Sequence, residues 1–560
     1  MTSTHPGWPD ATARQYRRAG YWRGQTFGSY LRQWAALRPH RTALVDGDRR
    51  WTYAQLDDGA DRLASGLRGI GISRGDRVVI QLPNQAEFPL VWFALQRLGA
   101  VPVHAMPAHR SSEIRHLIRT SGAVAYVIPD RHLRCDYREL AREMLHDQTG
   151  EPGERTLTTV VVAGDPGSFA GFIALSDLMD SPEPTPGTTQ VHRAATTAGD
   201  PHNGGAAPCD LALLLVSGGT TGLPKLIPRT HDDYAYNARA AAEAGGLGED
   251  SVYLAVLPIA FNFTLACPGM LGTFMAGGTV VLSTDPSPQT AFRLIEREGV
   301  TLTSITPPLV PHWLQEHLDQ GGHALTTLRV LQVGGARLSD HRARALGPAL
   351  GTRVQQVFGM AEGLINVTGL DDPEDLICST QGRPISPADE IRVVGPDDRP
   401  VPDGEPGELL TRGPYTLRGY YRAEEYNAKV FTADGFFRTG DIVRRLPSGH
   451  LVVVGRVKDQ INRGGEKFAA TEVEDHLLTH PAITAVALVA APDAARGERS
   501  VAFVTCPDKE PSTRELASFL GRRGLAAYKF PDQVVRVDAF PMTAVGKIDK
   551  KQLVGLAQGV

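Results

Sequence analysis

The chain has 560 residues, of which 42% are hydrophobic and 21% are charged, and its formal net charge is −4. This length exceeds what one hydrophobic core normally serves, so two or more domains of a globular protein are expected. A mildly acidic balance without a basic block argues against nucleic acid as the main partner.

Short apolar runs that end in Gly or Pro alternate with amphipathic stretches along the first 360 residues. The apolar runs predict buried strands at 77–83, 123–129, 301–308, 328–335 and 354–359. The amphipathic stretches predict helices at 88–100 and 289–299. Alternation of this kind is typical of parallel α/β sheets.

The remaining segments depart from this pattern. Residues 181–209 are rich in Pro, Thr, Gly and Ala, which predicts a long surface loop or linker. Strands punctuated by glycine dominate after about residue 400 and indicate a small β-barrel-like part. The segment from about 457 mixes helical and strand patterns, which is typical of a small α+β domain.

Membrane insertion, export and structural metal binding are not indicated. The stretch from Ser251 to Thr284 has no charged residue and is long enough to span a bilayer, but prolines, glycines and Asn262 interrupt it. It is therefore interpreted as the interior of a large domain. The five scattered cysteines form no C-x-x-C pair, and the N-terminus has no apolar signal segment. A reducing cytoplasm is the expected compartment.

An apolar strand at 211–216 leads into a loop rich in Gly and Thr. The loop has the residues Ser217, Gly218, Gly219, Thr220, Thr221 and Gly222, and Lys225 follows Pro224. Glycines let several N–H groups turn toward one anion, and hydroxyls and a lysine add donors and charge, which is what a triphosphate needs. The spacing is not that of a Walker A loop, because Pro224 stands where the second glycine would be. For such a run alone, a flexible turn is the alternative.

This loop resembles the nucleotide loop of the adenylate-forming superfamily, which includes acyl-CoA synthetases, luciferases and the adenylation domains of peptide synthetases. Further motifs follow in the family's order: "WTYAQLD" (51–57), "VFGMAEG" (357–363), "FRTGDIV" (437–443), "GRVKDQINRGGEK" (455–467) and "PMTAVGKIDK" (541–550). The resemblance implies a large N-terminal domain of parallel α/β sheets at 1–455, which would bind ATP and the acid. It also implies a small mobile C-terminal domain at 456–560, with its hinge near Lys458.

The resemblance also implies a role for each motif in joining a carboxylic acid to the α-phosphate of ATP with release of pyrophosphate. Lys547 would bridge both anions, and Glu362 would bind Mg²⁺, the expected cofactor beside ATP. Asp441 would accept hydrogen bonds from the ribose, assisted by Arg456. Taken singly, each of these residues could be a turn residue or a solvated charge. The adenine would lie against two segments, and the backbone of Val357 would bind its amino group. The residues of the two segments are Gly334, Gly335, Ala336, Val357, Phe358, Gly359, Met360 and Ala361.

The segment around "IAFNFTLACPG" (259–269) resembles the aryl-acid branch of the family, the stand-alone ligases that activate 2,3-dihydroxybenzoate or salicylate for siderophores and related peptides. The likeness extends to 101–114, 330–339, 355–368 and 523–532. Asn262 would contact the 2-hydroxyl of the ring, because a buried amide without a partner is costly. The branch often has Ser in place of Cys267 for 2,3-dihydroxybenzoate and tends to have Cys for salicylate, and a thiol suits a ring C–H. Core packing is the alternative for Cys267. The remaining lining would come from Tyr236, Phe263, Gly335, Ile365 and Val367.

Two departures from the branch leave the ring substituents open. Phe261 stands where aryl-acid ligases usually have His, and Val367 replaces a bulkier residue, so 6-methylsalicylate or 3-hydroxyanthranilate are alternatives to salicylate. Only 13 residues follow Lys547, so the expected acceptor is the phosphopantetheine arm of a separate aryl carrier protein, or coenzyme A. An aryl-CoA ligase is the second hypothesis, and a catalytically inactive ligand-binding homologue is the third.

Overall fold

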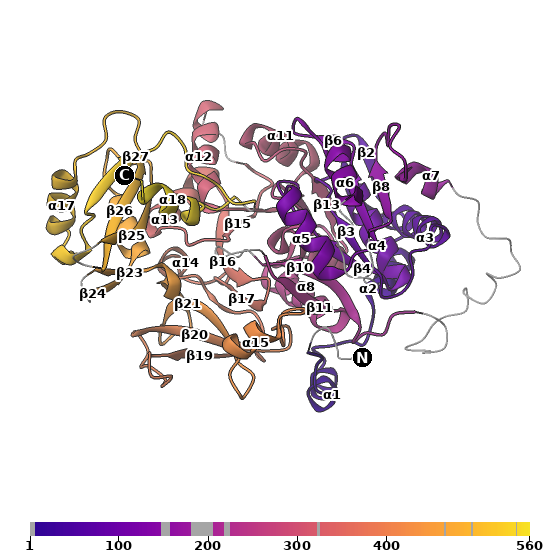
Figure 1. The fold of residues 1–560 in the computed structure, drawn as a ribbon, viewed down its shortest axis with the longest axis horizontal. Coiled ribbons are helices and arrows are strands. Elements are labelled where there is room, and N and C mark those ends of the chain that lie inside the picture. The colour runs from indigo at the N-terminus through magenta and orange to yellow at the C-terminus, as the bar shows by residue number, and fades with distance from the viewer. Residues whose placement is uncertain are drawn as a thin grey trace, which may run out of the picture.

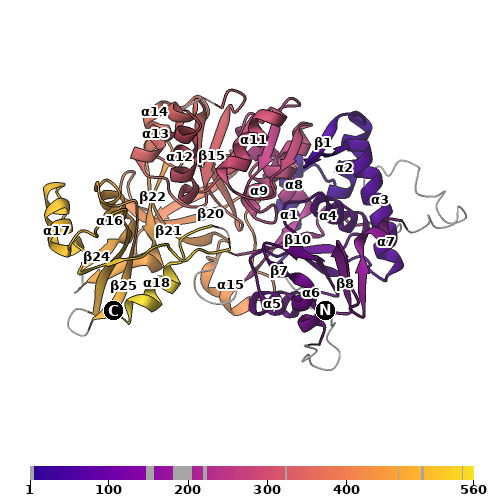
Figure 2. The same cartoon turned by 90° about the horizontal axis from the view of Figure 1, so that it is seen from above.

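The computed structural model describes residues 6–146, 157–180, 205–217, 224–321, 325–463, 466–493, 497–544 and 546–559. These residues form two large α/β sheets, a four-stranded antiparallel sheet and a five-stranded C-terminal sheet. The C-terminal sheet lies at one end of the molecule, and the seven-stranded sheet lies toward the other end (Figures 1 and 2).

The larger sheet has nine strands in the order β18-β17-β16-β15-β14-β12-β13-β1-β2. Its central pairs are parallel, from β16 across to β1, whereas the pairs at both edges are antiparallel. The strands are β1 (Thr42–Asp46), β2 (Arg49–Thr52), β12 (Val252–Ala255), β13 (Thr279–Leu282), β14 (Leu302–Ile305), β15 (Val330–Gly334), β16 (Arg353–Met360), β17 (Gly363–Val367) and β18 (Arg383–Pro384).

The second sheet has seven strands in the order β11-β10-β4-β3-β5-β8-β9, parallel except for the β10–β11 hairpin. The strands are β3 (Arg77–Ile80), β4 (Val101–His104), β5 (Ala125–Pro129), β8 (Thr159–Ala163), β9 (Phe172–Ala174), β10 (Leu211–Val216) and β11 (Leu226–Thr230). A separate two-stranded ribbon pairs β6 (Arg131–His132) with β7 (Cys135–Asp136).

Helices cover both faces of the two sheets. One apolar cluster lies between the sheets, and alternate strand residues such as Leu254 and Ile305 face a second cluster on the outer side of the larger sheet. The helices of this region are α1 (Asp10–Arg18), α2 (Phe27–Leu37), α3 (Tyr53–Gly69), α4 (Glu87–Leu98), α5 (Ser111–Ser121), α6 (Tyr137–His146), α7 (Leu175–Met179), α8 (His231–Ala244), α9 (Asn262–Ala266), α10 (Gly269–Ala276), α11 (Pro288–Glu298), η1 (Pro307–Leu309), α12 (Val310–Asp319), α13 (Asp340–Leu350) and α14 (Glu374–Ser379).

The C-terminal third contains two smaller sheets. The antiparallel sheet β19-β20-β21-β22 comes first, and a single 3₁₀ turn leads into the sheet β24-β23-β26-β25, on which β27 pairs with β26. The elements are β19 (Glu390–Val394), β20 (Pro406–Arg412), α15 (Glu424–Val430), β21 (Phe437–Arg445), β22 (Leu451–Arg456), η2 (Val457–Asp459), β23 (Gln460–Arg463), β24 (Glu466–Ala469), α16 (Ala470–Leu477), β25 (Ala485–Asp493), β26 (Gly497–Thr505), α17 (Thr513–Arg522), η3 (Ala527–Lys529), β27 (Gln533–Arg536) and α18 (Lys550–Ala557).

The sequence patterns predict these elements well. The five expected strands correspond to β3, β5, β14, β15 and β16, and the two expected helices to α4 and α11. Helix α11 shows why the local signal suffices: Ser287 caps its first turn, Pro288 opens it and Gly299 ends it at φ 65°. The predicted α/β class with a small α+β C-terminal part is confirmed, and the part expected to be barrel-like is the sheet β19–β22.

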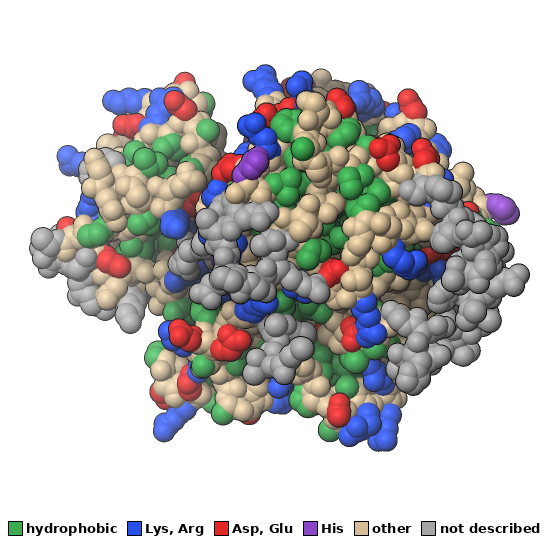
Figure 3. Space-filling view, turned by 45° about the vertical axis from the view of Figure 1, so that its right-hand side comes forward, with side chains coloured by type: hydrophobic (Ala, Val, Ile, Leu, Met, Phe, Trp, Pro, Cys, Tyr) green, Lys and Arg blue, Asp and Glu red, His purple; other side chains and the backbone are tan. Residues whose placement is uncertain are grey.

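Two further expectations concern single segments. The uncharged stretch from residue 251 to 284 forms β12, α9, α10 and β13, nearly all of it buried, as expected for the interior of a domain. Within the described ranges, no helix has both the length and the apolarity to cross a bilayer. The predicted linker at 181–209 lies outside the described residues up to 204. On the face shown in Figure 3, charged side chains of both signs are interspersed.

Candidate active site

The predicted phosphate loop joins the two strands of the β10–β11 hairpin, at the carboxyl end of β10. Lys225 N donates to Ser217 Oγ, and Ser217 N donates to the carbonyl of Lys225, both at 2.9 Å, which closes the base of the loop. The ammonium of Lys225 lies 3.9 Å from the ring centre of Tyr426 on α15. Gly218 to Gly222 lie outside the described residues. Carboxyl ends of parallel strands are where ligands bind in α/β sheets.

The two predicted adenine segments are adjacent, because β15 and β16 are parallel neighbours. Gly334 is paired with Val357, and β15 ends there. A Cβ on Gly334 would lie 2.8 Å from the carbonyl oxygen of Val357 and 3.0 Å from the ring of Phe263, so only glycine fits. Gly335 has φ 87°, which also favours glycine, and Ala336 follows it. The continuation of β16 is paired with β17 and carries Phe358, Gly359 and Met360, and Ala361 begins the turn that follows.

Glu362 lies in the turn between β16 and β17 and is held at both its backbone and its side chain. Its carbonyl accepts from Leu417 N at 2.7 Å, and its Oε1 accepts from the hydroxyl of Tyr420 at 2.8 Å. Burial, followed by the charge of Glu362, raises the pKa of Tyr420, so the phenol stays protonated and remains a donor. The carboxylate itself is half-buried.

Asp441 and Arg456 form the predicted ribose site on neighbouring strands. They are paired in register on β21 and β22, and Arg456 Nε donates to Asp441 Oδ1 at 2.7 Å. Asp441 is only 3% exposed. Burial raises the pKa of Asp441, whereas the positive charges of Arg456, Lys547 and Lys458 lower it. The structure therefore places the two predicted lysines in the electrostatic environment of this carboxylate.

Lys547 reaches this group from the segment between β27 and α18. Its Cε would lie 3.4 Å from a Cβ on Gly335, so the side chain is directed at the end of β15. A tight turn presents it: Thr543 N donates to the Lys547 carbonyl at 2.7 Å, and Lys547 N donates to Thr543 Oγ1 at 3.1 Å. Burial and then Arg456 lower the pKa of Lys547 to about 8, against the opposing charges of Asp441 and Glu362.

The predicted aryl-pocket residues gather in one apolar cluster. It contains Tyr236, Phe263, Cys267, Val357, Ile365 and Val367, with Phe261 packed against it. The hydroxyl of Tyr236 is within 2.7 Å of Ser386 Oγ, and its ring packs edge-on against Tyr415 at 5.8 Å between ring centres. These side chains come from α8, α9, β16 and β17, so the fold brings together residues that the sequence separates by more than one hundred positions.

Asn262 and Cys267 lie in this cluster with a bonding pattern that the sequence did not predict. The amide was expected to have no protein partner, but Asn262 Oδ1 accepts from the hydroxyl of Tyr234 at 2.7 Å, and its Nδ2 donates to Cys267 Sγ at 3.4 Å. Burial raises the pKa of Cys267 to about 12, so the thiol is neutral. Asn262 therefore does not need a ligand hydroxyl to satisfy its amide, and the premise of the predicted ring contact was wrong. Within the described residues, Cys267 Sγ is the one acceptor for Nδ2, which leaves its second N–H to donate.

Sequence reasoning missed the side chains that hold the segment before α9. Asn84 Nδ2 donates to the carbonyls of Ala255 and Leu257 at 2.9 and 3.0 Å, and its Oδ1 accepts from Ile259 N at 2.7 Å. His104 Nδ1 lies 3.2 Å from the Ala260 carbonyl. Burial lowers the pKa of His104 to about 4, so the ring is neutral. A polar residue directly after an apolar strand, as in "QLPN" and "VPVH", is the signal that could have indicated them.

The segment before α2 also contributes to the cluster without having been predicted. Tyr16 and Trp22 are buried members of it, and Tyr21 packs against Tyr236 with 5.2 Å between ring centres. Trp22 Nε1 donates to the Pro414 carbonyl at 2.9 Å, which anchors the segment. The aromatic rings of this segment also pack edge-on against one another, so the segment forms a layer of aromatic side chains behind Tyr236.

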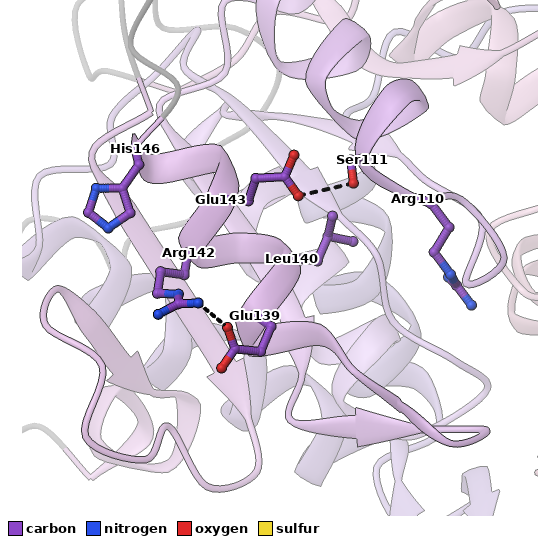
Figure 4. Close-up of a pocket in the computed structure, with 7 residues that line it drawn as sticks. All are labelled: Arg110, Ser111, Glu139, Leu140, Arg142, Glu143 and His146. Atoms are coloured by element: carbon purple, nitrogen blue, oxygen red, sulfur yellow. Dashed lines mark hydrogen bonds and ion pairs between the residues drawn. The ribbon is translucent and has the colours of Figure 1, made fainter.

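The described surface includes a groove of about 550 Å³, and two of its lining residues, Arg110 and Ser111, lie in the segment 101–114. It lies on the surface between α5 and α6 (Figure 4), and its lining is Arg110, Ser111, Glu139, Leu140, Arg142, Glu143 and His146. None of the predicted site residues belongs to that lining. Its charged side chains neutralise one another, since Glu139 pairs with Arg142 at 2.5 Å. Within the part of the chain that is described, no cluster of three or more His, Cys, Asp or Glu side chains is arranged to hold a metal ion.

Known proteins resemble this chain over almost its whole length. The family model "AMP-binding enzyme" matches residues 31–421, and "AMP-binding enzyme C-terminal domain" matches 472–547. The 2,3-dihydroxybenzoate-AMP ligase of Bacillus subtilis is 52% identical, covering 98% of this chain and 96% of its own. A salicylyl-CoA synthase / salicylate adenylyltransferase from a Streptomyces species is 49% identical, over 99% and 97%.

Two mycobacterial proteins are also similar. The salicyl-AMP ligase / salicyl-S-ArCP synthetase of Mycobacterium tuberculosis is 47% identical and covers 98% of this chain and 94% of its own. The apo structure of MbtA from Mycobacterium smegmatis is 46% identical, covers 99% of both chains and superimposes with a TM-score of 0.73.

Proposed function

The chain belongs to the AMP-binding enzymes of the adenylate-forming superfamily, and from this premise we propose that it is a salicylate-type aryl-acid–AMP ligase. In the first step, a carboxylate oxygen of the acid bonds to the α-phosphorus of ATP, and pyrophosphate leaves. In the second step, a thiol attacks the acyl carbon of the adenylate, and AMP leaves. The acceptor we propose is the phosphopantetheine arm of a separate aryl carrier protein, in siderophore or other natural-product biosynthesis.

One observation carries the first step: Lys547 extends from the segment between β27 and α18 to Gly335, within the electrostatic environment of the Asp441–Arg456 pair. Both reactants of the step are anions, so their approach requires a positive charge placed between them. The carboxylate of Asp441 suits the hydroxyls of a ribose, and we place the planar base at the end of β15, beside Gly335, which has no side chain. The same end of the sheet thus offers complementary groups for each part of an acyl adenylate.

We propose that Glu362 holds Mg²⁺ when ATP is bound. Magnesium usually binds through one or two carboxylates together with substrate phosphates, and a single half-buried carboxylate near the base of the phosphate loop fits that requirement. The ion would supply charge neutralisation for the phosphate oxygens. Tyr420 and the backbone of Leu417 fix the position of Glu362. The loop from Ser217 to Gly222 and Lys225 would hold the β- and γ-phosphates.

The apolar cluster supports an aromatic acid. Two polar side chains, Asn262 and Cys267, stand among aromatic and aliphatic walls, which suits a ring with one polar ortho substituent. Salicylate is the acid we propose. Because Phe261 is apolar, 6-methylsalicylate, 3-hydroxyanthranilate and 2,3-dihydroxybenzoate are alternative substrates to be assayed beside it. The five cysteines are all free thiols, which suits a cytoplasmic enzyme.

An aryl-CoA ligase is the second candidate, because the name of the Streptomyces relative includes a CoA synthase. The name of the Mycobacterium tuberculosis relative includes a carrier-protein synthetase, which corresponds to the first candidate. The proposed rotation about Lys458, which would bring a second face of the C-terminal part to the adenylate, would serve either thiol. Lys458 lies in the 3₁₀ turn between the last strand of one sheet and the first of the next.

Two assays test the function. ATP–pyrophosphate exchange over substituted benzoates should show the highest kcat/KM for a 2-hydroxy acid, and equal rates with aliphatic acids would refute the assignment. Thioester formation should then be faster with a phosphopantetheinylated aryl carrier protein than with coenzyme A. Equal or faster transfer to coenzyme A would assign the second candidate function instead.

A further inference from the structure

Tyr234 forms a hydrogen bond with the side-chain amide of Asn262, which is expected to face the aromatic acid. It lies in the first turn of α8, is fully buried, and is not one of the residues assigned to the pocket. Its hydroxyl donates to Asn262 Oδ1 at 2.7 Å. Burial raises the pKa of Tyr234 well above its usual value, so the phenol is protonated at neutral pH and can donate.

The ring of Tyr234 is fixed from several sides, so its hydroxyl cannot easily turn elsewhere. The guanidinium of Arg229 lies 4.7 Å from the ring centre, and Phe27 packs edge-on at 6.2 Å. Arg229 is itself held by Asp233 at 2.7 Å. Asn262 Oδ1 is the acceptor that the described structure provides for this phenol.

This contact decides which way the amide of Asn262 points. The oxygen and nitrogen of an amide have nearly the same shape, so hydrogen-bond partners determine the orientation. If the amide turned over, the hydroxyl hydrogen of Tyr234 would lose its acceptor in a buried position, which is unfavourable. The oxygen therefore faces Tyr234, and Nδ2 faces Cys267 with one N–H directed to the sulfur. Among the described residues Nδ2 has no second acceptor, so its other N–H can donate to a ligand.

We propose that Tyr234 is a specificity-determining positioning residue, which fixes the Asn262 amide as a donor so that the site selects acids whose ortho substituent accepts a hydrogen bond. A phenolic oxygen accepts readily, whereas the amino group of anthranilate is mainly a donor, and benzoate offers no partner. The inference rests on the proposed function, because it concerns the ring that the ligase would bind.

The test is Tyr234→Phe, which removes one oxygen atom. The kcat/KM of pyrophosphate exchange is measured with salicylate, anthranilate and benzoate on the wild type and the variant. The ratio of salicylate to anthranilate should fall by roughly 2- to 13-fold, the equivalent of one net hydrogen bond, because the amide can then turn. Benzoate activation and the KM for ATP should not change. Ratios on one preparation are independent of the folded fraction.

The matched control is Tyr53→Phe. Tyr53 is also fully buried in the cluster between the two large sheets, and its hydroxyl donates to the Gly278 carbonyl at 2.7 Å, away from Asn262. This variant should keep the wild-type ratio. Asn262→Asp provides a second variant: Tyr234 still donates to one carboxylate oxygen, the other oxygen becomes an acceptor, and the preference should shift toward anthranilate.

The outcomes separate the inference from the proposed function. If the wild type activates salicylate best but Tyr234→Phe leaves the salicylate-to-anthranilate ratio unchanged, or lowers all three acids equally, Tyr234 has only a packing role and the inference is wrong. A shift of Asn262→Asp away from anthranilate would also overturn it. If the wild type activates none of the three acids, the assignment of an aryl-acid ligase itself fails.

Discussion

Replacing Lys547 by Ala should separate the two half-reactions. The side chain is placed against Gly335 within the charged group of Asp441, Arg456 and Glu362. An ammonium about 4 Å from an anionic oxygen contributes about 4 kcal/mol at an effective dielectric constant of 20. Loss of one such contact in the transition state corresponds to a rate decrease of about 1,000-fold in adenylate formation.

The assay measures each step alone. Single-turnover formation of the adenylate is followed from acid and ATP, and thioester formation is followed from a supplied acyl adenylate. The first rate should fall by about three orders of magnitude, and the second should change by less than about threefold, because no new phosphorus bond forms in it.

Lys550→Ala is the matched control for this variant. Lys550 begins α18, three residues further on, and its Nζ pairs with Glu474 at 2.7 Å instead of reaching β15. Removing it takes away the same charge from the same segment, and both rates should stay close to those of the wild type. An adenylation loss below tenfold for Lys547→Ala, or an equal loss in both steps, would refute the role given to Lys547.

Three further predictions follow from the same geometry. Because burial lowers the pKa of Lys547 to about 8, its ammonium is present below that pH and is lost above it, so the kcat/KM of adenylation should decline as pH rises through about 8. A profile that stays flat to pH 9.5 contradicts this, and Lys547→Arg should move the decline upward. Lys458→Pro should reduce thioester formation more than adenylation, because a fixed φ stiffens the 3₁₀ turn, with Lys458→Ala as control; parallel losses would argue against rotation there. Cys267→Ser should raise the preference for 2,3-dihydroxybenzoate over salicylate by roughly 2- to 13-fold in competitive pyrophosphate exchange, which is the value of one hydrogen bond. Asn262→Leu should lower the activation of every 2-hydroxy acid. An unchanged ranking of the acids in both variants would assign the two residues to packing.

Much of the fold could be predicted because its signals are local. Strand β5 is a buried apolar run that ends in proline, and helix α11 has a cap residue followed directly by a proline at its start and a glycine at its end. The loop at 217–222 and the motif residues Asp441 and Lys547 each lie in a short characteristic string, and their roles stay predictions. The structure then brings Lys547 and Asp441 together from positions 106 residues apart.

The side chains that fix the site could not be predicted in this way. Asn84 forms hydrogen bonds with a segment 171 to 175 residues further along the chain, and Tyr234 on α8 donates to Asn262 on α9. No periodicity or short motif predicts such a hydrogen-bonded pair, because the two partners come within hydrogen-bond distance only after the tertiary structure has formed. The error about Asn262 has the same origin: a buried amide does require a partner, but the sequence does not reveal whether protein or ligand supplies it.

Arg229 links the parts of the site that the motifs describe separately. It follows the phosphate loop on β11, is fully buried, and pairs with Asp233, while its Nη atoms donate to the carbonyls of Ala361 and Tyr415 at 3.0 Å each. Ala361 precedes the carboxylate proposed to bind magnesium, and the ring under the guanidinium is Tyr234. A buried pair of this kind gives little net stability, yet removing one partner costs about 3–5 kcal/mol because the other charge is left unpaired. A stabilising role therefore does not explain why an arginine stands there. Its contacts do, since one rigid, planar group joins the strand after the phosphate loop to the turn before Glu362 and packs on the tyrosine proposed to orient Asn262. We expect Arg229 in this way to keep the proposed triphosphate and aryl-acid sites at a constant separation.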